Sequence, residues 1–377
     1  ALPFHAARTV FRAARGLQAG ALIFEIARSE MGYTDQRPSE YASCVLGAAM
    51  AEGYVGPVFI QGDHFQVSAK RYADSPQAET QAVRDLTLEA IRAGFFNIDI
   101  DASTLVDLKL PTIPEQQRLN CTLSAELTAY IRGLEPRGVT ISVGGEIGEV
   151  GGQNSTEPEL RAFMDGYNQS LVKLAPRAAG LSKISIQTGT THGGVVLPDG
   201  SIAQVKVDFE TLAKLSRLAQ RDYGLAGAVQ HGASTLPEAA FSRFAEAGAC
   251  EVHLATNFQN MLFDRLPDGL RQEMYAFLDR GYAKERKPDM SEEQFYYKVR
   301  KNALGPFKAK LWDVGASALA EIEKAWEEQF RLLFTRLNIG RTLPDALTFV
   351  RPVTVAPPLS DYVTEAALGE DVRDLAD

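Results

Sequence analysis

The sequence predicts an α/β protein, a (β/α)8 TIM barrel with a helical C-terminal extension. Up to about residue 280, short apolar segments alternate with segments of 12–20 residues whose apolar positions have helical spacing. Strict alternation of this kind predicts a parallel sheet, because each helix returns the chain to the start of the next strand. Seven such strands without a sign of a second domain favour the barrel, and a doubly wound open sheet is the alternative.

The strands are predicted from continuous apolar runs, which are typical of parallel sheets that are buried on both faces. Val58-Phe59-Ile60 is a clear case, and the run ends in Asp63-His64. The predicted strands cover residues 20–27, 56–64, 95–101, 139–148, 182–189, 225–232 and 250–256.

Helices are predicted between these strands. Residues 75–94 show the signals most clearly, with a Ser-Pro start, early acids and a terminal glycine. The chain opens on a helix over about residues 3–17, so the eighth strand is expected upstream of Ala1 or in a segment outside this sequence. The other predicted helices cover about residues 39–53, 114–133, 157–180, 208–224 and 236–249.

The pattern changes after about residue 280. Segments 280–313 and 317–338 are charged and helical, with aromatic residues at helical spacing, and segment 350–363 is rich in proline and extended. Such aromatic residues are more often core or subunit contacts than ligand contacts. We therefore predict a catalytic barrel domain over 1–280 and an extension over 281–377 used in packing or oligomerisation.

Composition narrows the class of protein. The net charge of −9 argues against nucleic acid or an anionic membrane as a partner. The sequence has no apolar run long enough to span a bilayer and no signal-peptide pattern. Cys44, Cys121 and Cys250 lie far apart, which predicts neither a disulfide framework nor a thiolate metal site and favours the cytoplasm.

Four of the five histidines lie at or near the carboxyl ends of predicted strands, where barrel enzymes place their active sites. They are His64, His192, His231 and His253, whereas His5 lies in the first helix. Three imidazoles around one point, with one coordination position open, are typical of catalytic zinc. The distribution of histidine therefore predicts a zinc site on one face of the barrel.

Acids occupy the same strand ends, at Asp63, Asp99, Asp101 and Glu146. An acid beside an imidazole can bind metal, transfer a proton or orient the ring. As a group these acids indicate an active site, although any one of them could simply cap the following helix.

Small residues accompany the histidines in three loops. Segments 189–194 and 231–235 each lead from a strand toward a helix, and small residues there allow backbone amides to approach a phosphate. Segment 151–156 contains glycine and polar residues and is a candidate for a mobile active-site loop.

These motifs resemble the class II, metal-dependent fructose- and tagatose-bisphosphate aldolases. The likeness extends over about residues 18–262, and the order and spacing of the motifs agree. The segments that carry it are DH at 63–64, DAS at 101–103, EIGEVGG at 146–152, THGG at 191–194 and HGAS at 231–234.

The resemblance implies a zinc-dependent aldolase that cleaves or forms a carbon–carbon bond in a phosphorylated ketose. The implied zinc ligands are His64, His192 and His231, with Glu146 as an alternate ligand or as a group behind the ligands. Among the strand ends only Lys183 offers an amine, so a Schiff-base mechanism has less support.

The resemblance also implies roles for the acids and for the loops that hold the substrate. Asp63 would serve as the acid/base for the aldehyde-derived hydroxyl, and Asp101 would help to place metal or substrate. Glu146 would contribute to catalysis as well as to metal binding. The implied contacts to substrate and phosphate are Gly193, Gly232, Ser234, Thr256 and His253.

The sequence departs from the family pattern in two loops. After the glycines at 151–152 the family has acids that supply the proton-abstracting base, whereas this chain has Gln153-Asn154. Glu149 and Glu157 are the candidates to replace them. The last strand usually ends in N-x-D-T, but here 253–256 reads HLAT, which predicts a different choice of ketose.

The MGYTD segment at 31–35 is similar to the accessory subunit of tagatose-bisphosphate aldolase, so a non-catalytic subunit that stabilises a partner enzyme is the alternative hypothesis. A weaker alternative is another metal-dependent lyase or epimerase. Zinc bound to the purified protein would support the enzyme, and a protein without zinc would support the accessory subunit. We predict an enzyme and a homo-oligomer.

Overall fold

The fold is built around a curled parallel sheet of seven strands. The computed structural model describes residues 2–148, 153–190, 197, 206–351, 353 and 355. Neighbouring strands along the chain are neighbours in the sheet, in the order β1 to β7, and all pairs are parallel. The strands are β1 (Ile23–Ala27), β2 (Phe59–Gln66), β3 (Asn97–Asp101), β4 (Ser142–Glu146), β5 (Lys183–Ser185), β6 (Ala228–Gln230) and β7 (Ala249–Val252).

All seven predicted strands are therefore confirmed, in a barrel-like order. The prediction of a closed eight-stranded barrel is corrected, because in the described part of the chain β1 and β7 form the two edges of the sheet. A groove of about 640 Å³ lies between these edges and is lined by both strands. Near the carboxyl ends of the strands an ion pair between Glu25 on β1 and His253 after β7 links the two edges. An eighth strand remains a prediction.

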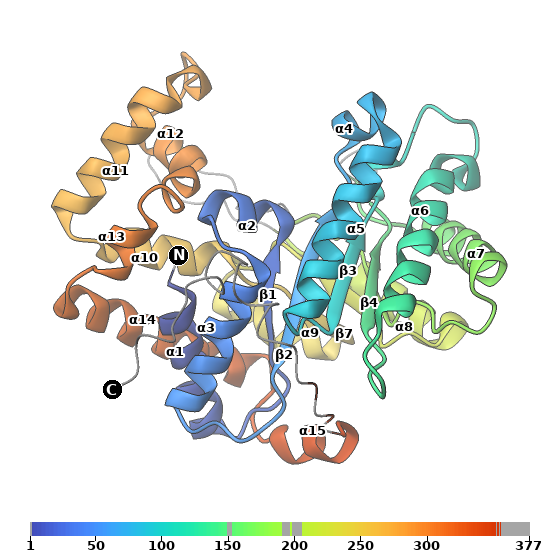
Figure 1. The fold of residues 1–377 in the computed structure, drawn as a ribbon, viewed down its shortest axis with the longest axis horizontal. Coiled ribbons are helices and arrows are strands. Elements are labelled where there is room, and N and C mark those ends of the chain that lie inside the picture. Colours follow the sequence, from blue (N-terminus) through green and yellow to red (C-terminus); the bar gives the residue numbers. More distant parts are fainter. Residues whose placement is uncertain are drawn as a thin grey trace, which may run out of the picture.

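Helices cover the outside of the curled sheet (Figure 1). Their starts follow local capping chemistry: the helix after β3 begins at Thr112, whose hydroxyl accepts from the amide of Glu115 while the Glu115 carboxylate accepts from Thr112. The helices of this part are α1 (Pro3–Leu17), α2 (Arg28–Thr34), α3 (Pro38–Ala51), α4 (Ala69–Asp74), α5 (Pro76–Arg92), η1 (Ser103–Leu105), α6 (Ile113–Leu134), α7 (Glu157–Leu174), α8 (Phe209–Tyr223) and α9 (Glu238–Glu246).

The C-terminal part is helical, as predicted, and has an apolar cluster of its own. Phe263, Met274, Phe295, Leu311 and Trp326 are buried in that cluster, so the aromatic residues serve packing. The helices are α10 (Thr256–Arg265), α11 (Asp268–Gly281), η2 (Ala283–Glu285), α12 (Glu292–Val299), η3 (Arg300–Ala303), α13 (Lys308–Trp312), α14 (Ala316–Arg336) and α15 (Leu343–Phe349).

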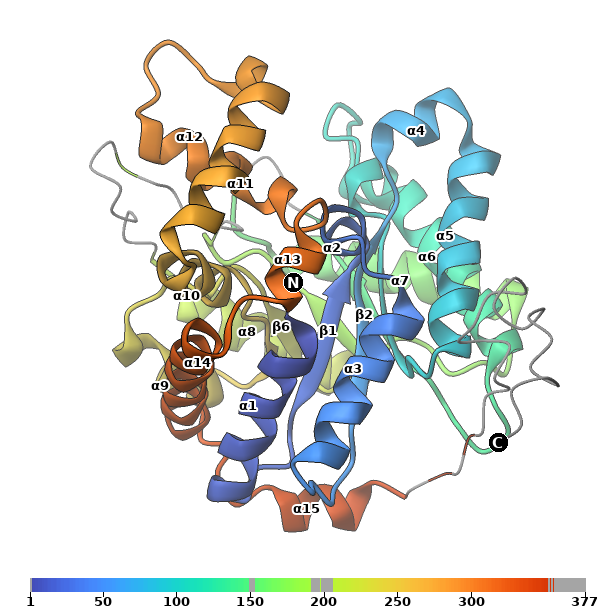
Figure 2. The same cartoon turned by 60° about the vertical axis from the view of Figure 1, so that its left-hand side comes forward.

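The C-terminal helices lie at both ends of the strands. Figure 2 shows α11 and α12 beyond the carboxyl end of β1, and α15 beyond its amino end. Helix α14 packs against α1, where His5 and Arg12 pair with Glu323 at 2.7 and 2.9 Å. His5 therefore has a structural contact away from the strand ends. Most of the predicted extended tail lies outside the described residues. No helix in the described part has the length and apolar character needed to cross a membrane.

Candidate active site

The site begins with an irregularity in β2. The pairing of β2 with β3 shifts register between Gly62 and Phe65, and His64 within this bulge has a φ of 42°. A bulge redirects side chains, and a left-handed backbone is uncommon for a residue other than glycine. The bulge leaves no space at Gly62, where a Cβ would lie 2.3 Å from the Phe65 ring. The local backbone thus presents Asp63 and His64 at the carboxyl end of the sheet.

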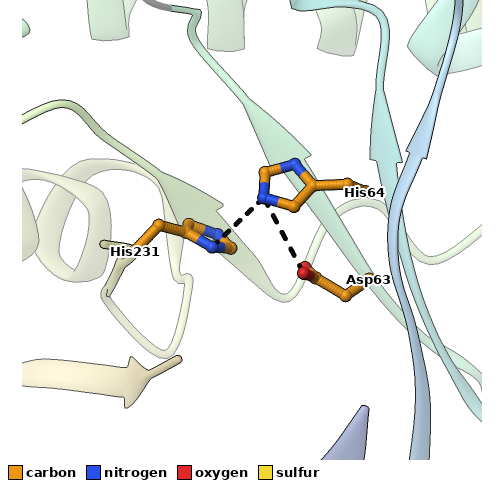
Figure 3. A group of neighbouring side chains, drawn as sticks. All are labelled: Asp63, His64 and His231. Carbon is orange, nitrogen blue, oxygen red and sulfur yellow. Dashed lines mark hydrogen bonds and ion pairs between the residues drawn. The ribbon is translucent and has the colours of Figure 1, made fainter. Parts of the chain in front are cut away.

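His64 faces His231, which directly follows β6 on the far side of the curled sheet (Figure 3). The Nε2 atom of His64 lies 3.2 Å from Nδ1 of His231 and 3.7 Å from the Oδ2 atom of Asp63. One ligand atom from each of the three residues lies within 4.8 Å of the others. Two imidazoles and a carboxylate therefore converge on one point.

The other nitrogen of each ring contacts a protein group. Nδ1 of His64 lies 2.6 Å from Glu146 at the end of β4 and 3.4 Å from Asp101 at the end of β3. Nε2 of His231 lies 2.8 Å from the hydroxyl of Ser185 at the end of β5. Metal-binding histidines typically have one nitrogen held in this way, which directs the other toward the ion. The residues present therefore fit a zinc ion between the two rings.

Burial and neighbouring charges set the protonation of these groups. Burial raises the pKa of Glu146 to about 7, and the Asp101 carboxylate adds to this effect. Burial opposes the charged form of His64, but Asp63 and Glu146 outweigh it and raise the pKa of the imidazole well above its usual value. Burial also opposes ionisation of Asp63, yet His64 and His253 hold its pKa well below the usual range. Asp63 is thus held in its anionic form.

A buried layer of charges lies beneath this point. The Nζ atom of Lys183 is 2.6 Å from Glu251 on β7, 3.1 Å from Asp99 on β3 and 2.6 Å from the side-chain oxygen of Gln61. Gly144 on β4 allows this approach, because a Cβ there would meet Asp99 at 2.2 Å. Burial lowers the pKa of Lys183, but Asp99 and Glu251 outweigh it and keep the amine charged. A charged, fully engaged amine does not favour a Schiff base.

His253 is buried where the two edges of the sheet meet. Its Nδ1 atom lies 2.8 Å from Glu25 and 3.3 Å from Asp63, and its Nε2 atom lies 3.0 Å from Glu251. Its ring centroid is 4.1 Å from that of His231. His253 therefore connects the groups near His231 to the acids of β1 and β7.

A cavity of about 1150 Å³ opens above these residues. One wall consists of the strand ends, with Asp63, His64, His231 and His253, and another comes from residues 287–301 of the extension. Three of the predicted substrate contacts, Gly232, Ser234 and Thr256, line the same cavity. The arrangement can hold a metal ion, transfer protons and enclose a small polar molecule.

The sequence matches the family model for class II fructose-bisphosphate aldolase over residues 3–323. The chain belongs to the class II fructose-bisphosphate aldolase family. The match covers every strand of the sheet and the first part of the extension, so the predicted resemblance is confirmed over a longer part of the chain than the motifs alone had covered.

Two solved structures show the same fold. A probable tagatose 6 phosphate kinase from Sinorhizobium meliloti 1021 superposes with a TM-score of 0.60 at 16% identity, covering 98% of this chain and 96% of that one. The fructuronate-tagaturonate epimerase UxaE from Cohnella laeviribosi gives a TM-score of 0.55 at 14% identity, covering 93% of this chain and 80% of that one. At these identities the likeness concerns the fold alone.

Some predicted residues of this class II aldolase chain are not brought to the site. His192, Gly193 and Glu149 lie outside the described residues. Glu157 is the first residue of α7 and pairs with Arg161 at 3.0 Å and Lys214 at 3.4 Å, away from the cavity. Helix packing therefore places Glu157 away from the cavity, and this position does not support it as a replacement for the loop base.

Three residues at the site were not singled out from the sequence. Glu25, Ser185 and Glu251 contact His253 or His231 from within strands. The signal that could have revealed two of them is an acid within an otherwise apolar strand, in LIFEIA and CEV. Nothing in the local sequence distinguishes Ser185 from an ordinary strand serine.

Proposed function

We propose that this chain is a zinc-dependent aldolase that cleaves or forms a carbon–carbon bond in a phosphorylated ketose. The observation that carries the proposal is the 3.2 Å approach of His64 and His231, each with its other nitrogen against a protein group. Membership of the class II aldolase family supports the reaction class. His192 is expected to complete the set of ligands, with Glu146 as an alternate ligand.

The residues of the chain would divide the remaining work. When bound, zinc would supply an electrophile for the carbonyl and hydroxyl oxygens of the ketose. Asp63 would accept the hydroxyl proton that cleavage releases, because it is anionic and lies beside the His64 ring. Asp101 would position His64, since it accepts from Ser103 and Gln66 and contacts the ring.

Phosphate would be held on the β6 side of the cavity. Gly232 has a φ of 67°, which brings its backbone close to the cavity, and Ser234 and Thr256 line the same wall. Gly193 would add a second backbone amide. Small residues and hydroxyls of this kind are typical of phosphate loops in barrels.

The choice of ketose would follow from His253. His253 stands at the strand end where the family pattern has asparagine, and its ring contacts the acids Glu25, Asp63 and Glu251. An unpaired substrate hydroxyl costs about 1–3 kcal/mol. We therefore expect fructose 1,6-bisphosphate to be a poorer substrate than another ketose phosphate. A cytoplasmic location and a homo-oligomer remain predictions from cysteine usage and from the extension.

A screen of ketose mono- and bisphosphates, with added zinc or with a chelator, tests the proposal. We expect one ketose phosphate to be cleaved in the presence of zinc and not after chelation. Cleavage that survives complete removal of metal would contradict the zinc-dependent mechanism. A protein that binds no zinc and cleaves none of the sugars would instead be a non-catalytic subunit.

A further inference from the structure

Aldol cleavage requires two proton transfers at different atoms. The hydroxyl oxygen loses its proton, the carbon–carbon bond breaks, and its electron pair passes to the carbon next to the carbonyl. That carbon then takes up a proton, so the atoms and electrons balance. Asp63 serves the hydroxyl in the function proposed above, and a second group must serve the carbon.

The loop after β4 does not provide an acid in its described part. Gln153 and Asn154 are amides, and the Asn154 side chain donates to Asp208 at 2.9 Å. Asp208 in turn accepts from the amides of Glu210 and Thr211 at the start of α8. Asp208 is thus engaged as a helix cap and is not available as a base.

The described acids that line the cavity are Glu25, Glu30, Asp63 and Asp289. Glu30 accepts from the amide of Ala27 at 2.9 Å and from the Tyr33 hydroxyl at 3.2 Å, which commits it to the junction between β1 and α2. Asp289 is exposed on the extension. Glu25 is the remaining candidate among the described acids that line the cavity.

Glu25 lies close to His253 and Asp63, although β1 and β7 are opposite edges of the sheet. Its Oε2 atom is 2.8 Å from Nδ1 of His253, and Asp63 reaches the same nitrogen at 3.3 Å. One atom from each of these three residues lies within 4.8 Å of the others. Two carboxylates thus share one imidazole beside the cavity.

We propose that Glu25 is the second acid/base residue of the site, which protonates the carbon during cleavage and deprotonates it during condensation. This inference rests on the proposed aldolase function. His253 acts as a positioning residue, because it fixes the carboxyl of Glu25 relative to Asp63. Each cleavage leaves one proton on Asp63 and takes one from Glu25, and exchange with solvent in the cavity that both residues line restores the two carboxyls.

The environment of Glu25 suits this task. Burial raises the pKa of its carboxyl to about 7, the charge of His253 opposes this rise, and Asp63 adds to it. A group that titrates near neutral pH can both give and take a proton during turnover. Carboxyls whose environments differ in this way commonly have different roles in one site.

Exchange of hydrogen for deuterium separates the two proton transfers. Dihydroxyacetone phosphate with zinc-loaded protein in D2O reports proton transfer at carbon, observed by proton NMR, and no aldehyde or hydroxyl step is needed. We expect Glu25→Gln to slow this exchange by roughly 10²–10⁴-fold and Asp63→Asn to slow it much less. The matched control is Glu157→Gln, which removes an acid away from the cavity and should exchange at the wild-type rate.

Each result of the exchange and cleavage measurements supports or contradicts the role of Glu25. Exchange at the wild-type rate in Glu25→Gln, with cleavage intact, would overturn the role of Glu25 and leave the aldolase function standing. Loss of zinc from Glu25→Gln would show that Glu25 holds the ion instead. A wild-type protein that neither cleaves ketose phosphates nor exchanges would overturn both proposals. If Glu25→Gln fails to fold, Glu25→Asp replaces it, and unchanged exchange in that variant overturns the inference.

Discussion

Replacing His231 with alanine is expected to remove zinc and activity together. His231 supplies one of the two imidazoles that face each other across 3.2 Å, and it comes from β6 while the other comes from β2. The remaining ligands with water would rarely retain a catalytic zinc ion. We expect about one zinc ion per chain in the wild-type protein and almost none in the variant, measured by plasma mass spectrometry beside a cleavage assay.

The matched control is His5→Ala. His5 pairs with Glu323 on α14, distant from the carboxyl ends of the strands, so this variant should keep its zinc and its activity. A His231→Ala protein that keeps a full complement of zinc would contradict the assignment of His231 as a ligand. Loss of activity with zinc retained would give His231 a different role.

Asp63→Asn should separate chemistry from metal binding. The two imidazoles remain in place, so zinc should stay bound, while the hydroxyl of the ketose loses its proton acceptor. Turnover should fall by roughly 10²–10⁴-fold, which is the usual contribution of a positioned acid/base. Cleavage kinetics and zinc content measured on the same preparation check this expectation.

The comparison for Asp63→Asn is Asp85→Asn, which removes an exposed acid on α5 away from the cavity. We expect wild-type turnover from that variant. If Asp63→Asn loses zinc in proportion to its activity, Asp63 is a ligand or a structural residue and the division of roles proposed here fails.

Much of the fold could be predicted because its signals are local. Each strand of a parallel sheet is an apolar run, and each helix carries its own caps, as at Thr112 and Glu115. The closure of the sheet could not be predicted in the same way. It depends on whether a strand pairs between β1 and β7, and no local pattern within the chain specifies that pairing.

The candidate site was predictable where its residues follow the strands in order. Asp63, His64, Asp101, Glu146 and His231 all lie at strand ends in the sequence, and the structure brings them together. The histidines stand out because imidazole is rare in this chain, with five residues in 377. Their convergence follows from parallel topology, which places all carboxyl ends at one edge.

The contacts between the two edges of the sheet could not be predicted. Glu25 and His253 are separated by most of the barrel sequence, and only the curl of the sheet brings them to 2.8 Å. The same holds for the bulge at His64, because a positive φ at a histidine has no local sequence signal. The second acid/base residue proposed here therefore emerges from tertiary structure alone.

Anomalous X-ray scattering at the zinc absorption edge, from crystals of the zinc-loaded protein, would locate the metal ion. We predict a single strong peak between the rings, about 2.0–2.1 Å from Nε2 of His64 and from Nδ1 of His231. An ion bound at another place in the chain, with no peak between these two nitrogens, would contradict the proposed site and the zinc-dependent mechanism built on it.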